Sequence, residues 1–177
     1  MNIETEIYKL IDRQGGFVND PQNQGGARKY GISQHTLQFW LAREATIDDV
    51  RNLQKRTAYE IYYSWYYIKP GYNELPTLIQ PFMLDTGAQS GMGQSRAIKL
   101  LQDALTCHGY PCGKVDGKIG EKTVAASQLA ASNMGNSLLK TLINRRVIVC
   151  ENIVKRDETQ RVFLAGWIAR AESFLPA

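Results

Sequence analysis

Hydrophobic residues recur every three or four positions along most of this chain, which is the spacing of an amphipathic helix. The pattern predicts helices over residues 3–13, 95–108, 136–156 and 159–174. No segment shows the regular alternation of apolar and polar residues that is typical of a half-buried strand. The sequence therefore predicts an all-α fold, with at most one short hairpin inside a glycine-rich loop.

Polar residues mark where further helices begin. Ser33 can cap a helix that runs to residue 41, and Thr46 with Asp49 has the spacing of a capping box for a short helix to residue 53. Thr57 precedes the segment "AYEIYYSWYYIKPG", a predicted helix that its Pro-Gly pair stops. Gly120 precedes another predicted helix.

Two segments are apolar on more than one side. Residues 59–67 contain six aromatic rings, and residues 75–91, "LPTLIQPFMLDTGAQSG", are apolar on most faces. Rings on every side of one helix cannot all be buried, so some are expected to line a ligand site while most pack in the core. The second segment is predicted to form a helix that is buried between two lobes.

The segment "RQGGFVNDPQNQGGARKYGIS", residues 13–33, interrupts the helical pattern with two glycine pairs. Neither a helix nor a regular strand tolerates that density of glycine, proline and asparagine. A loop this long in a compact domain is usually functional or disordered. It is the first candidate for a functional site.

Composition sets broad limits. The 177 residues suggest one domain, or two small lobes that share a core, and a net charge of +4 favours anionic partners only weakly. The opening residues "MNIETE" lack the apolar core of a signal peptide, and no apolar stretch is long enough to span a bilayer. We therefore expect synthesis in the cytoplasm, no stable membrane insertion and, if the protein is exported, another route.

Three cysteines, an odd number, argue against a disulfide framework. Cys107, His108 and Cys112 lie close together in "CHGYPC", as metal ligands often do. Because no second group of ligands completes a four-ligand site, we expect no metal and no cofactor.

Paired glycines and two later blocks form a pattern that covers nearly the whole chain. The loop contains "QGGFVNDP" at 14–21, then Gly25-Gly26 and Gly31-Ile32; the later blocks are "LPTLIQPFMLDTGAQSG" and "RAIKLLQDAL" followed by "KVDGKIGEKTVAA". This pattern resembles the family 108 glycoside hydrolases, lysozyme-like muramidases with a C-terminal peptidoglycan-binding segment. The resemblance implies a lysozyme-like helical lobe over residues 1–90 and a smaller helical peptidoglycan-binding-like lobe over 91–177. It also implies peptidoglycan as partner, and action in the periplasm or cell wall.

The chain departs from the family pattern where the chemistry would lie. The resemblance places Gln14 at the family's catalytic glutamate, Asn23 at an expected aspartate, Arg28 at an expected threonine and Gln89 at an expected asparagine. Asp20 is the one loop carboxylate at a family-matching position, and its side chain is expected to cap the following proline turn. Gln14 alone would fit an introduced exchange. The further departures favour a natural chain that kept the scaffold and lost or remodelled the chemistry.

Hydrolysis of a glycosidic bond needs a carboxylic acid that protonates the leaving oxygen. A glutamine amide has nearly the shape of glutamate but donates no proton at neutral pH, and loss of a general acid costs about 10²–10⁴ in rate. We therefore expect Gln14, with Asp20 and Asn23 nearby, to form a site that binds the glycan strand and cleaves it slowly or not at all.

Several other residues are expected to contact the ligand. Tyr30, Tyr63, Tyr66 and Gln89 would line the cleft beside Gln14.

In "KVDGKIGEKT", Lys114 and Lys118 could meet carboxylates of the peptide stems while Asp116 forms the turn; equally, all three could be solvated turn residues.

Two alternatives remain open. One is a peptidoglycan-binding protein of the same fold that performs no catalysis. The other is a DNA-binding protein, because "GISQHTLQFWL" is similar to a recognition helix of a helix-turn-helix motif. Against the second, the preceding segment is the glycine loop rather than a helix, and basic residues do not gather there, so we expect no nucleic-acid partner.

Overall fold

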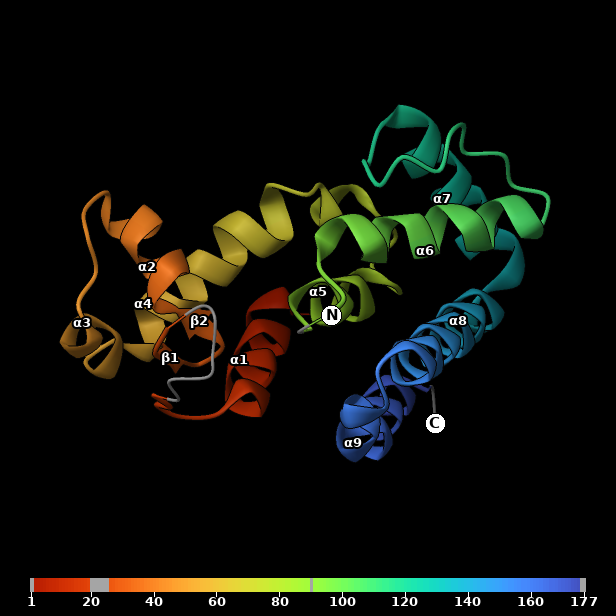
Figure 1. Cartoon of the computed structure of the whole chain (residues 1–177). Coiled ribbons are helices and arrows are strands. Elements are labelled where there is room, and N and C mark those ends of the chain that lie inside the picture. The colour runs from red at the N-terminus through yellow and green to blue at the C-terminus, as the bar shows by residue number, and fades with distance from the viewer. Residues whose placement is uncertain (1, 20–25, 90, 176–177) are drawn as a thin grey trace. The chain divides into compact units, whose positions relative to one another are not determined.

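The computed structural model describes residues 2–19, 26–89 and 91–175. Within these residues the chain forms nine α-helices and one two-stranded hairpin, which confirms the all-α class (Figure 1). It divides into two compact units, Met1–Tyr67 and Ile68–Ala177. In the described ranges, no helix combines the length and the apolar character needed to cross a membrane.

The first unit contains α1 (Ile3–Gln14), α2 (Gln34–Leu41), α3 (Ile47–Arg51) and α4 (Lys55–Ile61). Side-chain caps begin the first three of these helices. The Ser33 side chain accepts a hydrogen bond from the Thr36 backbone at the start of α2. Thr46 and Asp49 form a reciprocal capping box at α3. Both caps confirm the sequence prediction.

Helix α4 differs from its prediction in two ways. It begins at Lys55 rather than after Thr57, and it continues as a π-helix from Tyr62 to Ile68. Helix α4 contacts α1, and both helices contribute buried apolar residues to the first unit. These residues are Ala58 and Ile61 of α4 and Ile7, Leu10 and Ile11 of α1. Tyr59 of α4 stacks on Tyr63 of the π-helix, with the ring centroids 6.0 Å apart.

The second unit contains α5 (Gln80–Ala88), α6 (Gln94–Cys107), α7 (Glu121–Met134), α8 (Asn136–Arg156) and α9 (Arg161–Glu172). Short 3-10 helices at Tyr72–Glu74 and Glu158–Gln160 precede α5 and α9. The predicted helices at 95–108 and 136–156 are confirmed to within one residue, while the one at 159–174 is shorter at both ends.

Helix α5 is shorter than predicted, because residues 75–79 form turns and the helix begins with Pro81 near its first position. Residues 82–87 are all buried, as expected of a segment that is apolar on most sides. Helix α5 packs against α6 and belongs to the second compact unit. The position of α5 between two lobes and the lobe boundary at residue 90 stay predictions.

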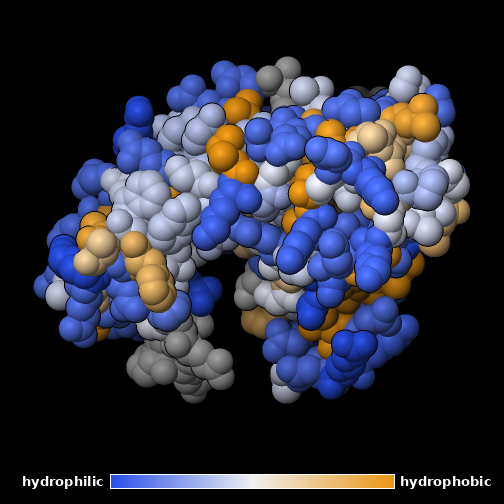
Figure 2. Space-filling model, turned by 90° about the horizontal axis from the view of Figure 1, so that it is seen from above, coloured by the Kyte–Doolittle hydropathy of each residue, from blue (hydrophilic) through white to orange (hydrophobic). Residues whose placement is uncertain are grey.

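Figure 2 shows one face of the molecule, on which hydrophobic residues form separate patches among hydrophilic ones. Large apolar side chains that are exposed in the described chain include Phe39, Ile148, Val162 and Phe163. Exposed apolar residues of this kind are common when they are scattered, and they become informative where they line a concave surface.

Candidate functional site

Gln14 is the last residue of α1, one position beyond the end of the predicted helix, and its side chain is half-buried. The buried residues Ile7, Leu10 and Ile11 fix the orientation of the helix. Gly15 ends it with φ of 81°, a conformation that glycine adopts without strain. The packing of α1 therefore sets the position from which the Gln14 side chain projects.

A tight hairpin lies beside this helix end. Strands β1 (Arg28–Lys29) and β2 (Ile32–Ser33) are joined by Tyr30 and Gly31, whose φ angles of 55° and 76° are typical of a two-residue hairpin turn. The Tyr30 backbone N–H donates to the Gly15 carbonyl over 3.0 Å. The Tyr62 hydroxyl donates to the Tyr30 carbonyl, also over 3.0 Å. These bonds attach the hairpin tip to α1 and to the π-helix.

Gly31 lies close to the side chains of Gln14 and Tyr62. A Cβ atom at this position would lie 2.9 Å from Cγ and Cδ of Gln14, and closer still to the Tyr62 hydroxyl. Gln14, Gly15, Tyr30, Gly31 and Tyr62 therefore form one cluster, here called the Gln14 cluster. It offers an amide, phenol hydroxyls and backbone groups, and none of its five residues has a carboxyl group.

The other predicted tyrosines lie around this cluster in different ways. The Tyr66 ring contacts the Tyr62 ring, with centroids 5.0 Å apart. Burial raises the pKa of Tyr66, and a hydrogen bond with Thr36 opposes that shift. Tyr63 is 38% exposed and stacks in the row with Tyr59. The tyrosine whose hydroxyl lies beside Gly31 is Tyr62, which sequence reasoning did not single out.

Two of the proposed loop residues, Asp20 and Asn23, lie outside the described residues, so their catalytic roles stay predictions. The neighbouring Arg28 is described. Its backbone pairs with that of Val18 through two hydrogen bonds of 2.8 Å, which close the glycine loop at its base.

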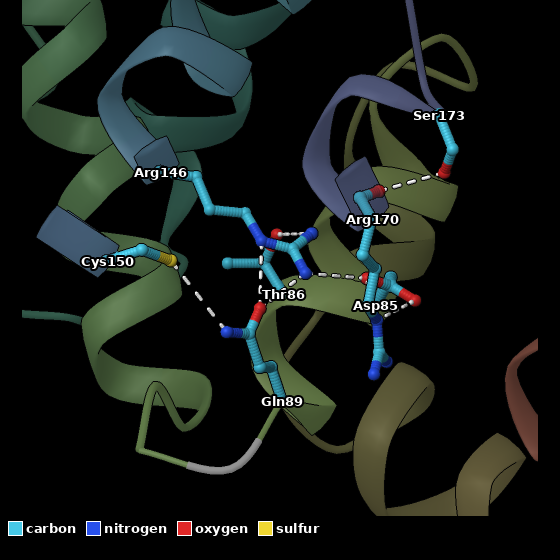
Figure 3. A network of polar contacts seen from close by, with 7 residues as sticks. All are labelled: Asp85, Thr86, Gln89, Arg146, Cys150, Arg170 and Ser173. Atoms are coloured by element: carbon cyan, nitrogen blue, oxygen red, sulfur yellow. Dashed lines mark hydrogen bonds and ion pairs between the residues drawn. The ribbon is translucent and has the colours of Figure 1, made fainter. Parts of the chain in front are cut away.

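Gln89 belongs to a buried polar network in the second unit (Figure 3). Nε of Arg146 donates to Gln89 Oε1 over 3.0 Å, and the Gln89 amide contacts Cys150 Sγ at 3.8 Å. Arg146 also donates to Thr86 and to Asp85, over 3.1 and 2.9 Å. The side chain of Gln89 thus holds α8 against the end of α5, and its role in ligand binding stays a prediction.

Asp85 is the charged centre of this network. Arg146 from α8 and Arg170 from α9 both donate to its carboxylate, each over 2.9 Å (Figure 3). Burial alone would raise the pKa of Asp85, but the hydrogen bonds and charges of Arg170 and Arg146 outweigh burial and hold the pKa below its usual range. Asp85 is therefore a carboxylate that joins three helices.

The loop between α6 and α7 contains Lys114, Asp116 and Lys118, all of which are exposed. Asp116 Oδ1 accepts hydrogen bonds from Gln102 Nε2 at 3.0 Å and from the Lys118 backbone at 2.9 Å, and these two bonds lower the pKa of Asp116. Gln102 in turn accepts from the Gly117 backbone at 2.9 Å. Asp116 thus forms the expected turn, and the ligand roles of all three residues stay predictions.

The cysteines of the segment "CHGYPC" lie in different environments. Cys107 is exposed, whereas Cys112 is buried with its thiol directed to the Gln102 carbonyl. Among the residues with described positions, no group of three or more His, Cys, Asp and Glu side chains is placed to hold a metal ion.

Helix α2, considered above as a recognition helix, directly follows the hairpin. Residues 15–19 and 26–33, the described part of the preceding segment, contain no helix.

Known proteins resemble both parts of the chain. Residues 7–91 match the family model described as Glycosyl hydrolase 108, and residues 96–172 match the one described as Predicted Peptidoglycan domain. The solved structure of Brucella abortus SagA is similar over 98% of this chain and 95% of its own, with 28% identity and a TM-score of 0.70. No curated protein matches the chain. The N-terminal part of this peptidoglycan-associated protein, residues 7–91, therefore belongs to the glycosyl hydrolase 108 family.

Proposed function

We propose that this protein binds the glycan strand of peptidoglycan at the Gln14 cluster and hydrolyses its β-1,4 bond slowly or not at all. One observation carries the proposal: Gln14 ends α1 beside Gly31 of the hairpin tip, which also lies close to the Tyr62 hydroxyl, and Gln14 stands at the position that the family pattern gives to glutamate.

The chemistry of the amide explains the expected loss of turnover. Glycoside hydrolysis needs a group that transfers a proton to the leaving oxygen as the bond breaks. The Gln14 amide can donate a hydrogen bond to that oxygen but cannot transfer the proton. Loss of this step alone slows the reaction by about 10²–10⁴.

Binding depends on features that the exchange of glutamate for glutamine leaves nearly intact. The tip of the hairpin offers the Tyr30 ring, and Tyr62 and Gly31 fix its position beside Gln14. Rings with a polar edge suit sugar surfaces, because one face packs on the ring and the edge forms hydrogen bonds. The match of residues 96–172 to a peptidoglycan domain supports the same ligand.

Comparison of the unmodified chain with the Gln14→Glu variant tests the proposal. Sedimentation with insoluble peptidoglycan measures binding, and release of reducing ends measures cleavage. Gln38→Glu on α2 is the matched control, because it adds the same charge elsewhere in the first unit. We expect all three proteins to bind and only Gln14→Glu to gain cleavage.

The other outcomes separate the alternatives. Binding by all three proteins without cleavage by Gln14→Glu would favour a non-catalytic peptidoglycan-binding protein, in which Asn23 and Arg28 also block the chemistry. Rapid cleavage by the unmodified chain would show that the acid is another residue. Absence of binding by every version would overturn the proposed function.

A further inference from the structure

A concave surface lies wholly within the second unit, between α6, α8 and the loop that follows α6. This groove encloses about 620 Å³, and its lining includes Arg96, Lys99 and Asp103 from α6, Val115 from the loop, and Arg145 and Ile148 from α8. It is called the basic groove below. Neither the Gln14 cluster nor the buried network around Asp85 contributes to its lining.

The charges of the basic groove favour an anionic ligand. Three cationic side chains face one carboxylate, and that carboxylate, Asp103, accepts a hydrogen bond from Arg145 at 3.3 Å. Arg96 donates to the Gly91 carbonyl, which holds its guanidinium near the start of α6. Arg96 and Lys99 are exposed and Arg145 is half-buried, so each adds a modest attraction, and together they give the groove a net positive charge that favours anions.

The apolar part of the lining favours a ligand with short hydrophobic groups. Val115 and Ile148 belong to the lining of the groove, and their side chains remain 41% and 54% exposed. A ligand that covers them would remove apolar area from water, worth about 25 cal/mol per Å². The ligand should therefore combine carboxylates with small aliphatic side chains.

The loop of the groove is held in place by the "VDGK" turn. Gln102 on α6 binds Asp116 and the Gly117 backbone. A Cβ at Gly117 would lie 2.9 Å from the Ser95 carbonyl oxygen and 3.2 Å from Cε of Lys99, so only glycine allows the loop to approach α6 this closely. This turn places Val115 in the wall of the groove.

We propose that the basic groove binds the peptide stems of peptidoglycan. Free carboxylates of a stem would pair with Arg96, Lys99 and Arg145, and its alanine methyl groups would cover Val115 and Ile148. A glycan strand without peptides offers hydroxyl and acetamido groups and one lactyl carboxylate on each muramic acid, but it lacks the further carboxylates and the alanine methyl groups of the stems. The inference rests on the proposed function, because it assigns a further contact with the same polymer.

Binding of the full-length chain to two forms of peptidoglycan tests this assignment. One form is intact, and the other has its peptides removed by an amidase. The groove variant combines Arg96→Gln, Lys99→Gln and Arg145→Gln. The matched control combines Lys140→Gln, Lys155→Gln and Arg156→Gln, which remove as many exposed cations from α8 outside the lining.

We expect the groove variant to bind intact peptidoglycan about tenfold more weakly than the unmodified chain, since each exposed ion pair adds a modest attraction. The control should bind as the unmodified chain does, and on peptide-free glycan all three proteins should bind equally. Asp103→Asn should strengthen binding to intact peptidoglycan, because it removes the one opposing charge. A gain of this kind cannot result from unfolding.

Three results would overturn the assignment. Equal binding by the groove variant and the unmodified chain would exclude the groove. An equal loss in the control would indicate a general effect of net charge, and the same loss on peptide-free glycan would exclude the peptide stems. Each of these leaves the proposed function intact, whereas failure of the unmodified chain to bind either form would overturn that function itself.

Discussion

Arg146 on α8 donates a hydrogen bond to Asp85 on α5 over 2.9 Å, and the two side chains are 0% and 2% exposed. Arg170 from α9 binds the same carboxylate. The other N–H groups of Arg146 reach Thr86 and Gln89, so the buried guanidinium is satisfied on several sides. One carboxylate thus determines how three helices pack.

Replacement of Asp85 by asparagine should lower the free energy of unfolding by about 3–5 kcal/mol, because it leaves two guanidinium groups without their anion in a buried site. Urea denaturation measures the change. The matched control is Asp103→Asn, which breaks a surface pair with Arg145 and should cost about 0–1 kcal/mol. Equal effects of the two substitutions would contradict the structural role of Asp85.

The same carboxylate should make stability depend on pH. Burial raises the pKa of Asp85, but Arg170 and Arg146 lower it by more than burial raises it. The pKa of Asp85 in the folded protein is therefore depressed. The stabilisation is therefore present above the unfolded pKa of about 3.9 and is lost as pH falls through the folded value. Between pH 7 and 3, the unmodified chain should lose more unfolding free energy than Asp85→Asn. Parallel curves would refute this.

Tyr72 and Gly87 should be coupled. The Tyr72 hydroxyl is buried and has no hydrogen-bond partner among the described residues, and a Cβ at Gly87 would lie 2.6 Å from it. We expect Tyr72→Phe to be neutral or to stabilise the protein by about 1 kcal/mol. Gly87→Ala should destabilise it by about 1–3 kcal/mol, and less in the Tyr72→Phe background. Strictly additive effects in thermal unfolding would exclude the contact.

The cysteines should react at different rates. Cys107 is exposed, whereas Cys150 is buried, and burial raises the pKa of its thiol despite opposing effects of Gln89 and Arg146. Since the thiolate is the reactive form, a thiol reagent should modify Cys107 rapidly and Cys150 only after unfolding. Mass spectrometry of the timed reaction identifies the modified residues. Cys107→Ser provides the control, and rapid labelling of that variant in the native state would contradict the prediction.

Local signals predicted much of the fold. Ser33 and Thr46 cap their helices as the sequence indicated, because a capping bond joins residues three positions apart. The π-helix at residues 62–68 was not predicted, since no local pattern distinguishes it from an α-helix. The helix predicted over residues 75–91 was too long. Apolar composition indicates that a segment is buried, but it does not indicate the residue at which a turn ends and a helix begins.

Contacts that are distant along the chain were less accessible to prediction. The paired glycines and the family pattern led to Gln14, but adjacent tyrosines gave no means to choose Tyr62 over Tyr63. Asp85 and Arg146 lie 61 positions apart in the sequence. The one local sign of this pair was the presence of a charged residue, Asp85, within an apolar helix. The basic groove was missed for the same reason, because α6 and α8 supply it together.

Gly31→Ala should disturb the Gln14 cluster through direct contact. Its Cβ would press on Gln14 and Tyr62, and its φ of 76° disfavours alanine, so we expect a loss of about 1–3 kcal/mol in unfolding free energy. Gly109→Ala is the control: it has a similar φ of 81° but no atom within 4 Å of its Cβ, and it should cost about 1 kcal/mol from backbone strain alone. If the cluster binds glycan, Gly31→Ala should also weaken binding to peptide-free glycan strands at a temperature where both variants remain folded, whereas Gly109→Ala should leave this binding unchanged. Unchanged binding by a folded Gly31→Ala protein would separate glycan recognition from this cluster.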